Sequence, residues 1–106
     1  MTDPSIFQKR LREIREKLGL SQKALGIQIG IDQFSASPRM NQYERGKHFP
    51  DQSTLDRLAN VVGVPVSYFF AKEDDLAELL VLWAELSSEQ RSAVLNMART
   101  MNIGSD

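Results

Sequence analysis

The chain has 106 residues, of which 42% are hydrophobic, so it can bury a core as one compact domain or as a small domain with a helical appendage. It contains no cysteine, which excludes disulfide frameworks and cysteine-based zinc or redox sites. Its net charge is −1, and it has neither a membrane-length apolar run nor an apolar segment of signal-peptide type, so we expect a cytoplasmic protein.

The charge is unevenly distributed along the chain. Residues 1–50 contain nine Lys and Arg against five acidic residues, a net +4, whereas residues 51–106 contain four against nine, a net −5. This division would suit a first half that faces a polyanion and a second half that does not. Because a small protein can also divide its charge this way by chance, the asymmetry alone does not decide the function.

Apolar residues at helical spacing, together with helix-start and helix-stop residues, predict an all-α protein. The predicted helices span residues 4–18, 22–29, 38–45, 52–62, 65–70, 76–86 and 88–101. Asp3, Ser21, Ser37, Asp51 and Ser87 are the residue types that cap helix N-termini, and each directly precedes a predicted helix. No segment alternates with the period of two that a strand requires, so we predict no sheet.

An ordered set of residues in the first two thirds of the chain carries the most specific information. The set is Leu18-Gly19-Leu20-Ser21-Gln22, Leu25, Ile29-Gly30, Tyr43-Glu44-Arg45-Gly46, Pro50, Leu55, Leu58-Ala59 and Val62-Gly63-Val64. It resembles the Cro/C1-type helix-turn-helix family, often called XRE-like, over about residues 6–70. The resemblance implies a five-helix lambda-repressor-like DNA-binding domain over residues 1–71. The two helices predicted in residues 72–106 lie outside the resemblance, and we expect them to form a C-terminal dimerisation segment.

The resemblance also implies that the third helix is the recognition helix, which enters the major groove of DNA. We expect its outward side chains to contact bases, because Asn and Gln suit adenine and Arg suits guanine. These expected base-contacting residues are Ser37, Arg39, Asn41 and Gln42. The expected phosphate-contacting residues are Gln22, Lys23, Arg45 and Lys47. The alternative for each of them is an ordinary solvated polar residue.

Two further positions have structural roles in the family. Arg15 and Glu44 occupy positions that hold an ion pair between the first and third helices of related phage repressors, and we expect them to pair here. Gly26 stands where the family usually has Ala, and it would let the two helices of the motif approach closely. The alternative is that Gly26 merely weakens its helix, by about 1 kcal/mol relative to Ala.

The turn between the second and third helices is longer than the family pattern. Tyr43 follows Gly30 by thirteen residues, where the family usually has about nine, so about four residues are extra near Gln33–Ala36. Phe34 could pack into the core to anchor this insertion, or it could project as an apolar contact. The start of the third helix, and with it the positions of Ser37 and Pro38, depends on the path of this turn.

The C-terminal segment is apolar on nearly every side of its first helix, which an exposed helix cannot be. We predict a homodimer formed by this segment, through Leu76, Leu79, Leu80, Trp83, Val94 and Met101. The alternative is an intramolecular helical hairpin that completes the core.

These features favour a transcription regulator, acting as a repressor that binds a palindromic operator as a dimer. Two alternatives remain open: an antitoxin-type protein whose C-terminal helices bind a protein partner, and a helical adaptor that does not bind DNA. An enzyme is the least favoured class, because His48 is the only histidine and has no evident catalytic partner. We expect no cofactor and no metal, since a lone histidine without cysteine is a poor metal site.

Overall fold

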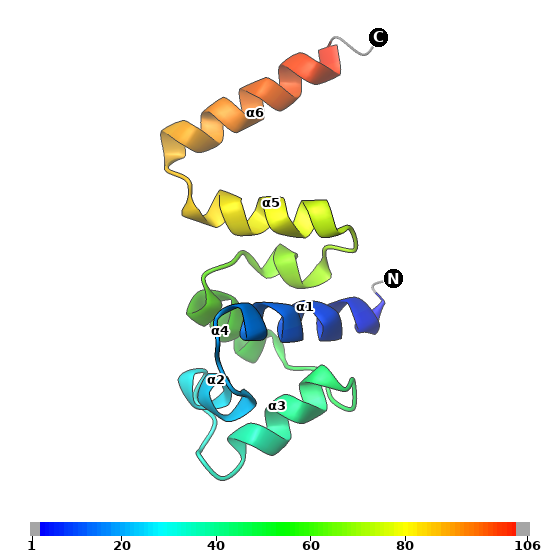
Figure 1. The fold of residues 1–106 in the computed structure, drawn as a ribbon, viewed down its shortest axis with the longest axis vertical. Coiled ribbons are helices and arrows are strands. Elements are labelled where there is room, and N and C mark those ends of the chain that lie inside the picture. Colours follow the sequence, from blue (N-terminus) through cyan, green and yellow to red (C-terminus); the bar gives the residue numbers. More distant parts are fainter. Residues whose placement is uncertain (1–2, 104–106) are drawn as a thin grey trace.

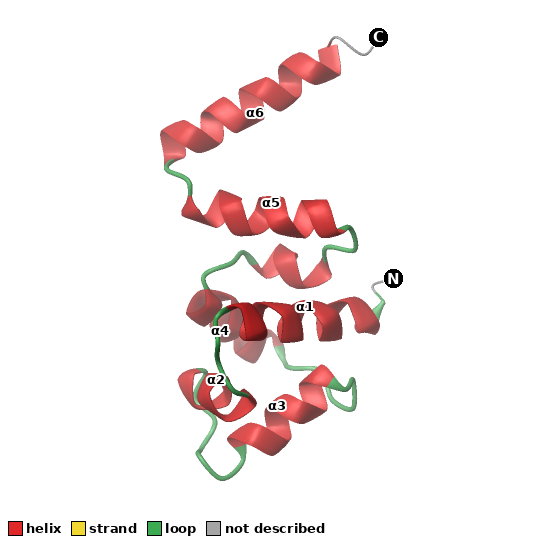
Figure 2. Cartoon of the chain, viewed as in Figure 1, coloured by secondary structure: helices red, strands yellow, loops and turns green. Residues whose placement is uncertain are grey.

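A computed structural model describes residues 3–103, and every regular element within that range is a helix (Figures 1 and 2). The elements are α1 (Pro4–Lys17), α2 (Gln22–Gln28), α3 (Ala36–Glu44), α4 (Gln52–Val62), the 3₁₀ helix η1 (Val66–Phe70), α5 (Asp74–Glu85) and α6 (Ser88–Ile103). The all-α prediction, with five helices followed by two C-terminal helices, is confirmed. No described helix has the length and hydropathy that crossing a membrane would require.

Most of the predicted helix starts are confirmed, because they depend on hydrogen bonds within a few residues. The side chains of Asp3, Ser21 and Asp51 each accept a hydrogen bond from a backbone N–H in the first turn of the helix that follows. At α6, the Ser87 hydroxyl accepts from the backbone N–H of Gln90, and the Gln90 side chain accepts from the backbone N–H of Ser87. These reciprocal bonds form a capping box.

The predicted start of the third helix is wrong. The α3 helix begins at Ala36 with Ser35 as its N-cap, so Ser37 lies inside the first turn and is not the cap. The cause is Asp32, whose carboxylate accepts hydrogen bonds from the backbone N–H groups of Phe34 and Ser35, both at 3.0 Å. This turn reverses the chain earlier than the Ser37-Pro38 pattern suggested, and Pro38 is accommodated because N–H groups of the first turn have no helical partner.

The core is enclosed by α1, α2, α3, α4 and η1. Its fully buried residues include Leu11 of α1, Leu25 of α2, Met40 of α3, Leu58 of α4 and Phe69 of η1, each no more than 1% exposed. The core therefore ties the helices of the motif to elements on both sides of it in the sequence. Phe34 does not join this core, so the alternative in which it anchors the inserted turn does not hold.

The α2 and α3 helices touch at Gly26. A Cβ atom placed on Gly26 would lie 2.8 Å from the Cβ of Ala36 and 3.0 Å from its carbonyl oxygen. Both are closer than normal van der Waals contact, and the oxygen belongs to the backbone, which cannot rotate away. The expected close approach at Gly26 is therefore present, and its contact is the first residue of α3.

A buried cation joins α1 to the segment that leads into α5. The Arg10 side chain is only 1% exposed, and its guanidinium donates to the backbone oxygens of Ala71 at 2.8 Å and Lys72 at 3.3 Å. It also pairs with Glu13 at 3.0 Å and Asp74 at 3.1 Å. A buried charge is tolerated only when it is paired and hydrogen-bonded, and these four partners satisfy that condition.

The two C-terminal helices differ in how they pack. On α5, Ala77 is buried and Leu80 packs against the core. The α6 helix projects away from the body (Figure 1), and none of its described residues is buried. The alternative in which a C-terminal hairpin completes the core therefore does not hold for the described part of α6.

Candidate nucleic-acid interface

The α3 helix has one buried face and one outward face. Ala36, Met40 and Tyr43 form the buried face. The remaining residues include the four that the sequence singled out as base contacts: Ser37 and Arg39 are exposed, and Asn41 and Gln42 are half-buried. The buried stripe thus fixes the rotation of the helix and leaves polar side chains on the opposite side.

Arg15 and Glu44 form a two-point ion pair between α1 and α3. Arg15 Nε lies 2.6 Å from Glu44 Oε2, and Arg15 Nη2 lies 3.0 Å from Glu44 Oε1. Only 14% of the Arg15 side chain and 5% of the Glu44 side chain are exposed. The hydrogen bonds to Glu44 raise the pKa of Arg15, so the guanidinium keeps its charge in this enclosed position.

Gln22 extends this polar cluster to α2. Its side-chain amide nitrogen donates to Glu44 Oε1 at 3.3 Å and to Asn41 Oδ1 at 3.4 Å. One residue expected to contact phosphate and one expected to contact a base are therefore hydrogen-bonded to each other. The fixed geometry of both side chains reduces the conformational entropy that binding would otherwise cost.

Two hollows flank α3, and together they contain most of the predicted site. The first, of about 320 Å³, is lined by Arg12, Arg15, Gln22, Asn41, Glu44 and Arg45. The second, of about 410 Å³, is lined by Arg39, Gln42, Tyr43, His48, Phe49, Asp51 and Thr54. The structure thus brings Arg45 beside Asn41, and on the other side it brings Arg39 beside Gln42.

Arg12 is a candidate that the sequence analysis missed. It lines the first hollow with Arg45, and its exposed side chain is held by Glu16 at 3.1 Å. The spacing could have identified it, because residues three apart share a helix face and Arg15 was already assigned to the side facing α3. Arg12 adds a cation to the rim of the interface.

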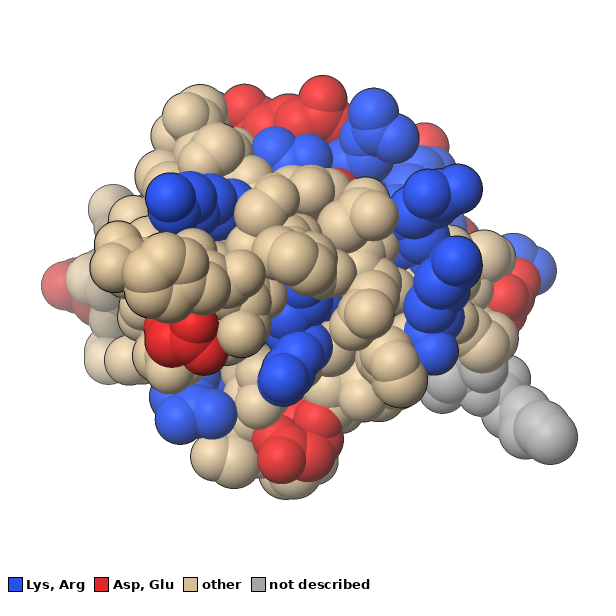
Figure 3. All heavy atoms as spheres, turned by 90° about the horizontal axis from the view of Figure 1, so that it is seen from below, with Lys and Arg blue, Asp and Glu red and all other residues tan. Residues whose placement is uncertain are grey.

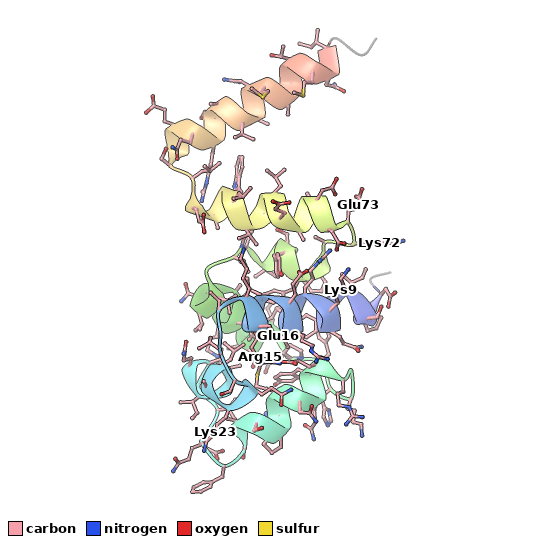
Figure 4. The ribbon with its side chains drawn as sticks, in the orientation of Figure 1. Lys9, Arg15, Glu16, Lys23, Lys72 and Glu73 are labelled. Carbon is pink, nitrogen blue, oxygen red and sulfur yellow. The ribbon has the colours of Figure 1, made fainter. Side chains whose placement is uncertain are left out.

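The basic side chains spread over the end of the molecule that carries α2 and α3. Viewed from that end, Lys and Arg side chains lie across the surface, with acidic ones at a few places between them and along the rim (Figure 3). Lys23 points outward there (Figure 4), and Lys47 is exposed on the loop after α3, where its backbone N–H donates to the Gln42 carbonyl at 2.9 Å. Within residues 3–103 no group of acidic or histidine side chains could hold a metal ion.

The residues expected at a dimer interface lie at the opposite end of the molecule. Leu76 and Leu79 of α5 are 42% and 44% exposed, and Met101 of α6 is 67% exposed. Leu80, Trp83 and Val94 are half-buried. Trp83 is partly covered by Arg91, whose guanidinium lies 5.5 Å from the ring centroid. Apolar surface therefore remains uncovered on both C-terminal helices of the single chain.

The chain is similar to one family model and to several known proteins. A protein-family model described as "Helix-turn-helix domain" matches residues 8–75 of this chain. The HTH-type transcriptional regulator ImmR of Bacillus subtilis (strain 168) is 33% identical over 66 residues, which cover 62% of this chain and 49% of ImmR. The chain thus spans about half the length of that relative.

Two further relatives are covered over more of their length. The SPbeta prophage-derived uncharacterised HTH-type transcriptional regulator YonR of Bacillus subtilis (strain 168) is 32% identical over 78 residues, which cover 71% of this chain and 68% of YonR. The crystal structure of the transcriptional regulator BswR superposes with a TM-score of 0.86 at 39% sequence identity, covering 93% of this chain and 98% of that one. The similarity to BswR therefore extends beyond residue 75 into the C-terminal helices.

Proposed function

Because the chain belongs to the Cro/C1-type (XRE-like) helix-turn-helix family of transcriptional regulators, we propose that it is a sequence-specific repressor that inserts α3 into the major groove of DNA. The observation that carries this proposal is the outward face of α3. Its polar side chains stand on a helix whose rotation is fixed by buried residues and by contact with α2. A recognition helix must be held at a fixed angle in this way to enter a groove.

We assign residues to base contacts or to phosphate contacts by the chemistry of their side chains. Arg39, Asn41 and Gln42, with Ser37 beside them, have the donors and acceptors that read base edges. The phosphates of the DNA backbone would be contacted by Lys23, Arg45, Lys47 and the Gln22 amide. Arg12 of α1 would add one more such contact. Neutralising several phosphates releases counterions, so the affinity should fall steeply as salt rises.

We further propose that the chain acts as a dimer through α5 and α6. The exposed apolar residues of both helices would be buried between two copies, and a two-fold dimer would present two α3 helices to half-sites about 34 Å apart. Such a dimer would prefer a palindromic operator, and occupation of that operator would exclude other proteins from the same DNA. The protein would act in the cytoplasm without a cofactor.

A second candidate is an antitoxin-type regulator whose C-terminal helices bind a different protein. The observation that favours it is the apolar surface of α6, where Met97 is 62% and Met101 is 67% exposed. Methionine is common on surfaces that adapt to a partner. If the purified protein has a single mass in solution that is twice the mass of the chain, self-association is favoured over binding of a different protein.

The test is selection of bound duplexes from a random pool, repeated with two single variants. The Gln42→Ala variant should lose preference at one base-pair position, at a cost of about 1–3 kcal/mol for that position. The Arg45→Ala variant should bind all sequences more weakly and reduce the salt dependence by about one released ion. Failure of the wild-type protein to enrich any sequence would contradict the proposed function.

A further inference from the structure

Phe34 is a large apolar side chain that the fold leaves in solvent. It is 85% exposed, the highest fraction among the large exposed hydrophobic residues of the described chain. It lies on the inserted turn between α2 and α3, beside the exposed polar residues Asp32 and Gln33. Folding this protein therefore buries almost none of the Phe34 ring.

The turn nevertheless holds Phe34 in a defined place. On one side, the Asp32 carboxylate accepts from the backbone N–H groups of Phe34 and Ser35, and the Asp32 carbonyl accepts from Ser35 N–H at 3.1 Å. On the other side, Ala36 is fully buried and packs against Gly26. The residue is thus fixed between two anchors, and its ring is displayed by an ordered turn.

The position of Phe34 relative to α3 indicates what the ring could contact. It comes two residues before the first residue of α3, and the N-terminal part of a recognition helix is the part that reaches base edges in the major groove. The apolar feature that the major groove offers is the C5 methyl group of thymine. We propose that Phe34 reads thymine, by packing its ring on the methyl group of a base next to those contacted by α3. This inference rests on the proposed function.

The experiment uses the full chain and removes the methyl group and the ring in turn. Selection from a random pool should give a wild-type site with a thymine beside the α3 contacts, and Phe34→Ala should lose that preference alone. Replacing this thymine by deoxyuridine removes only the methyl group. The wild-type protein should then bind about fourfold more weakly, the fold-change that corresponds to about 0.8 kcal/mol for one buried carbon. The Phe34→Ala protein should bind both duplexes equally.

Two further variants serve as controls. Phe34→Leu keeps an apolar side chain and should retain part of the difference between the thymine and deoxyuridine duplexes. Leu18→Ala removes another exposed apolar side chain, 46% exposed at the end of α1, and should retain all of it. Because Phe34 is exposed, thermal melting of Phe34→Ala should match the wild type, so that any loss belongs to binding.

The outcomes separate this inference from the function on which it rests. Equal wild-type affinity for the two duplexes would overturn the thymine contact while leaving sequence-specific DNA binding intact. A change in assembly mass for Phe34→Ala, with the deoxyuridine effect unchanged, would identify a protein contact and would also overturn it. A wild-type chain that selects no duplex would overturn both proposals together.

Discussion

Both carboxylate oxygens of Glu44 accept hydrogen bonds, although only 5% of the side chain is exposed. Oε2 accepts from Arg15, and Oε1 accepts from Arg15 and Gln22. The pair joins residues 29 apart in the sequence, and it fixes the C-terminal end of α3 against α1. Removing one partner of such a pair leaves the other charge with too few partners.

We expect Glu44→Ala to lower the free energy of unfolding by about 1–3 kcal/mol, because Arg15 keeps only its bond to the Leu20 carbonyl at 2.9 Å. Urea unfolding followed by circular dichroism measures this. The matched control is Glu16→Ala, which breaks the exposed pair with Arg12 and should cost less than about 1 kcal/mol. Equal losses in the two variants would contradict a structural role for the Glu44 pair.

Arg10 is a buried residue whose position could not be predicted from the sequence. It lies within the apolar stripe of α1, between Phe7 and Ile14, but arginine is usually exposed and nothing near it in sequence predicts burial. Its partners Ala71 and Asp74 are more than 60 residues away. By contrast, the pairing of Arg15 with Glu44 was predictable, because the family resemblance supplied both positions at once.

At the scale of elements, the helix starts were predictable wherever a cap and the backbone N–H that donates to it lie within three residues, as at Ser21 and Asp51. The start of α3 was not, because Ser37-Pro38 is a good local start and two other contacts override it. One is the Asp32 turn, and the other is the packing of Ala36 on Gly26, ten residues away. The second contact exists only once α2 and α3 have come together.

Replacing Gly26 by alanine should have two opposing effects on stability, and their balance tests the contact between α2 and α3. Alanine at Gly26 would favour the α2 helix by about 1 kcal/mol but would drive a methyl group into Ala36. Since the Ala36 carbonyl oxygen lies only 3.0 Å away and belongs to the backbone, we expect a net loss of about 1–2 kcal/mol in the free energy of unfolding.

The double variant Gly26→Ala, Ala36→Gly removes the Cβ–Cβ clash and serves as the control. Comparison of the single and double variants by urea unfolding gives the coupling energy between the two positions. We expect the second substitution to be less destabilising in the Gly26→Ala background than in the wild type. Strict additivity of the two effects would contradict a direct contact between α2 and α3 at this point.

Acid should loosen the attachment of α5 to α1. Asp74 accepts from Lys9 at 2.9 Å and pairs with Arg10 at 3.1 Å, and these interactions, Lys9 first, hold the pKa of Asp74 below its ordinary value of 3.8. A carboxylate with a lowered folded-state pKa stabilises the fold above pH 3.8, and this contribution is lost as the pH falls through the folded-state pKa.

Asp74→Asn should therefore flatten the dependence of unfolding free energy on pH below the ordinary Asp pKa of 3.8. Urea unfolding at a series of pH values measures the slope. Part of the slope should remain, because Asp3, Asp32 and Asp51 also have lowered pKa values, chiefly through hydrogen bonds with nearby residues. Lys9→Gln should give an intermediate slope, and an unchanged slope in Asp74→Asn would contradict the assignment.

At the scale of the whole molecule, the two ends differ in the kind of surface that they expose. The end with α2 and α3 carries cations (Figure 3) and a polar helix face. The far end carries apolar side chains on α5 and α6 that no described part of the chain covers. The apolar character of the second end was predictable from sequence. The way α6 leaves the body was not, because a hairpin and a projecting helix require the same apolar pattern.

We expect the double variant Leu79→Gln, Met101→Gln to shift the mass in solution from dimer to monomer, because it removes apolar surface from both C-terminal helices. Light scattering measures this. The variant should lose more than about tenfold in affinity for a duplex with two half-sites and little for a single half-site. The control Leu18→Gln changes an equally exposed leucine outside these helices and should remain dimeric; a monomeric wild type would contradict the proposed assembly.

The enclosed guanidinium of Arg10 has a mechanical consequence for such an assembly. By donating to the carbonyls of Ala71 and Lys72, it anchors the segment that leads into α5 to α1. A dimer formed through α5 would then hold its two α3 helices at a fixed separation. Such a dimer would accept only half-sites at the spacing that this separation of the two α3 helices allows. Operators whose half-sites are spread by two or three base pairs should be bound poorly, and Arg10→Met, by loosening the joint, should blunt that discrimination.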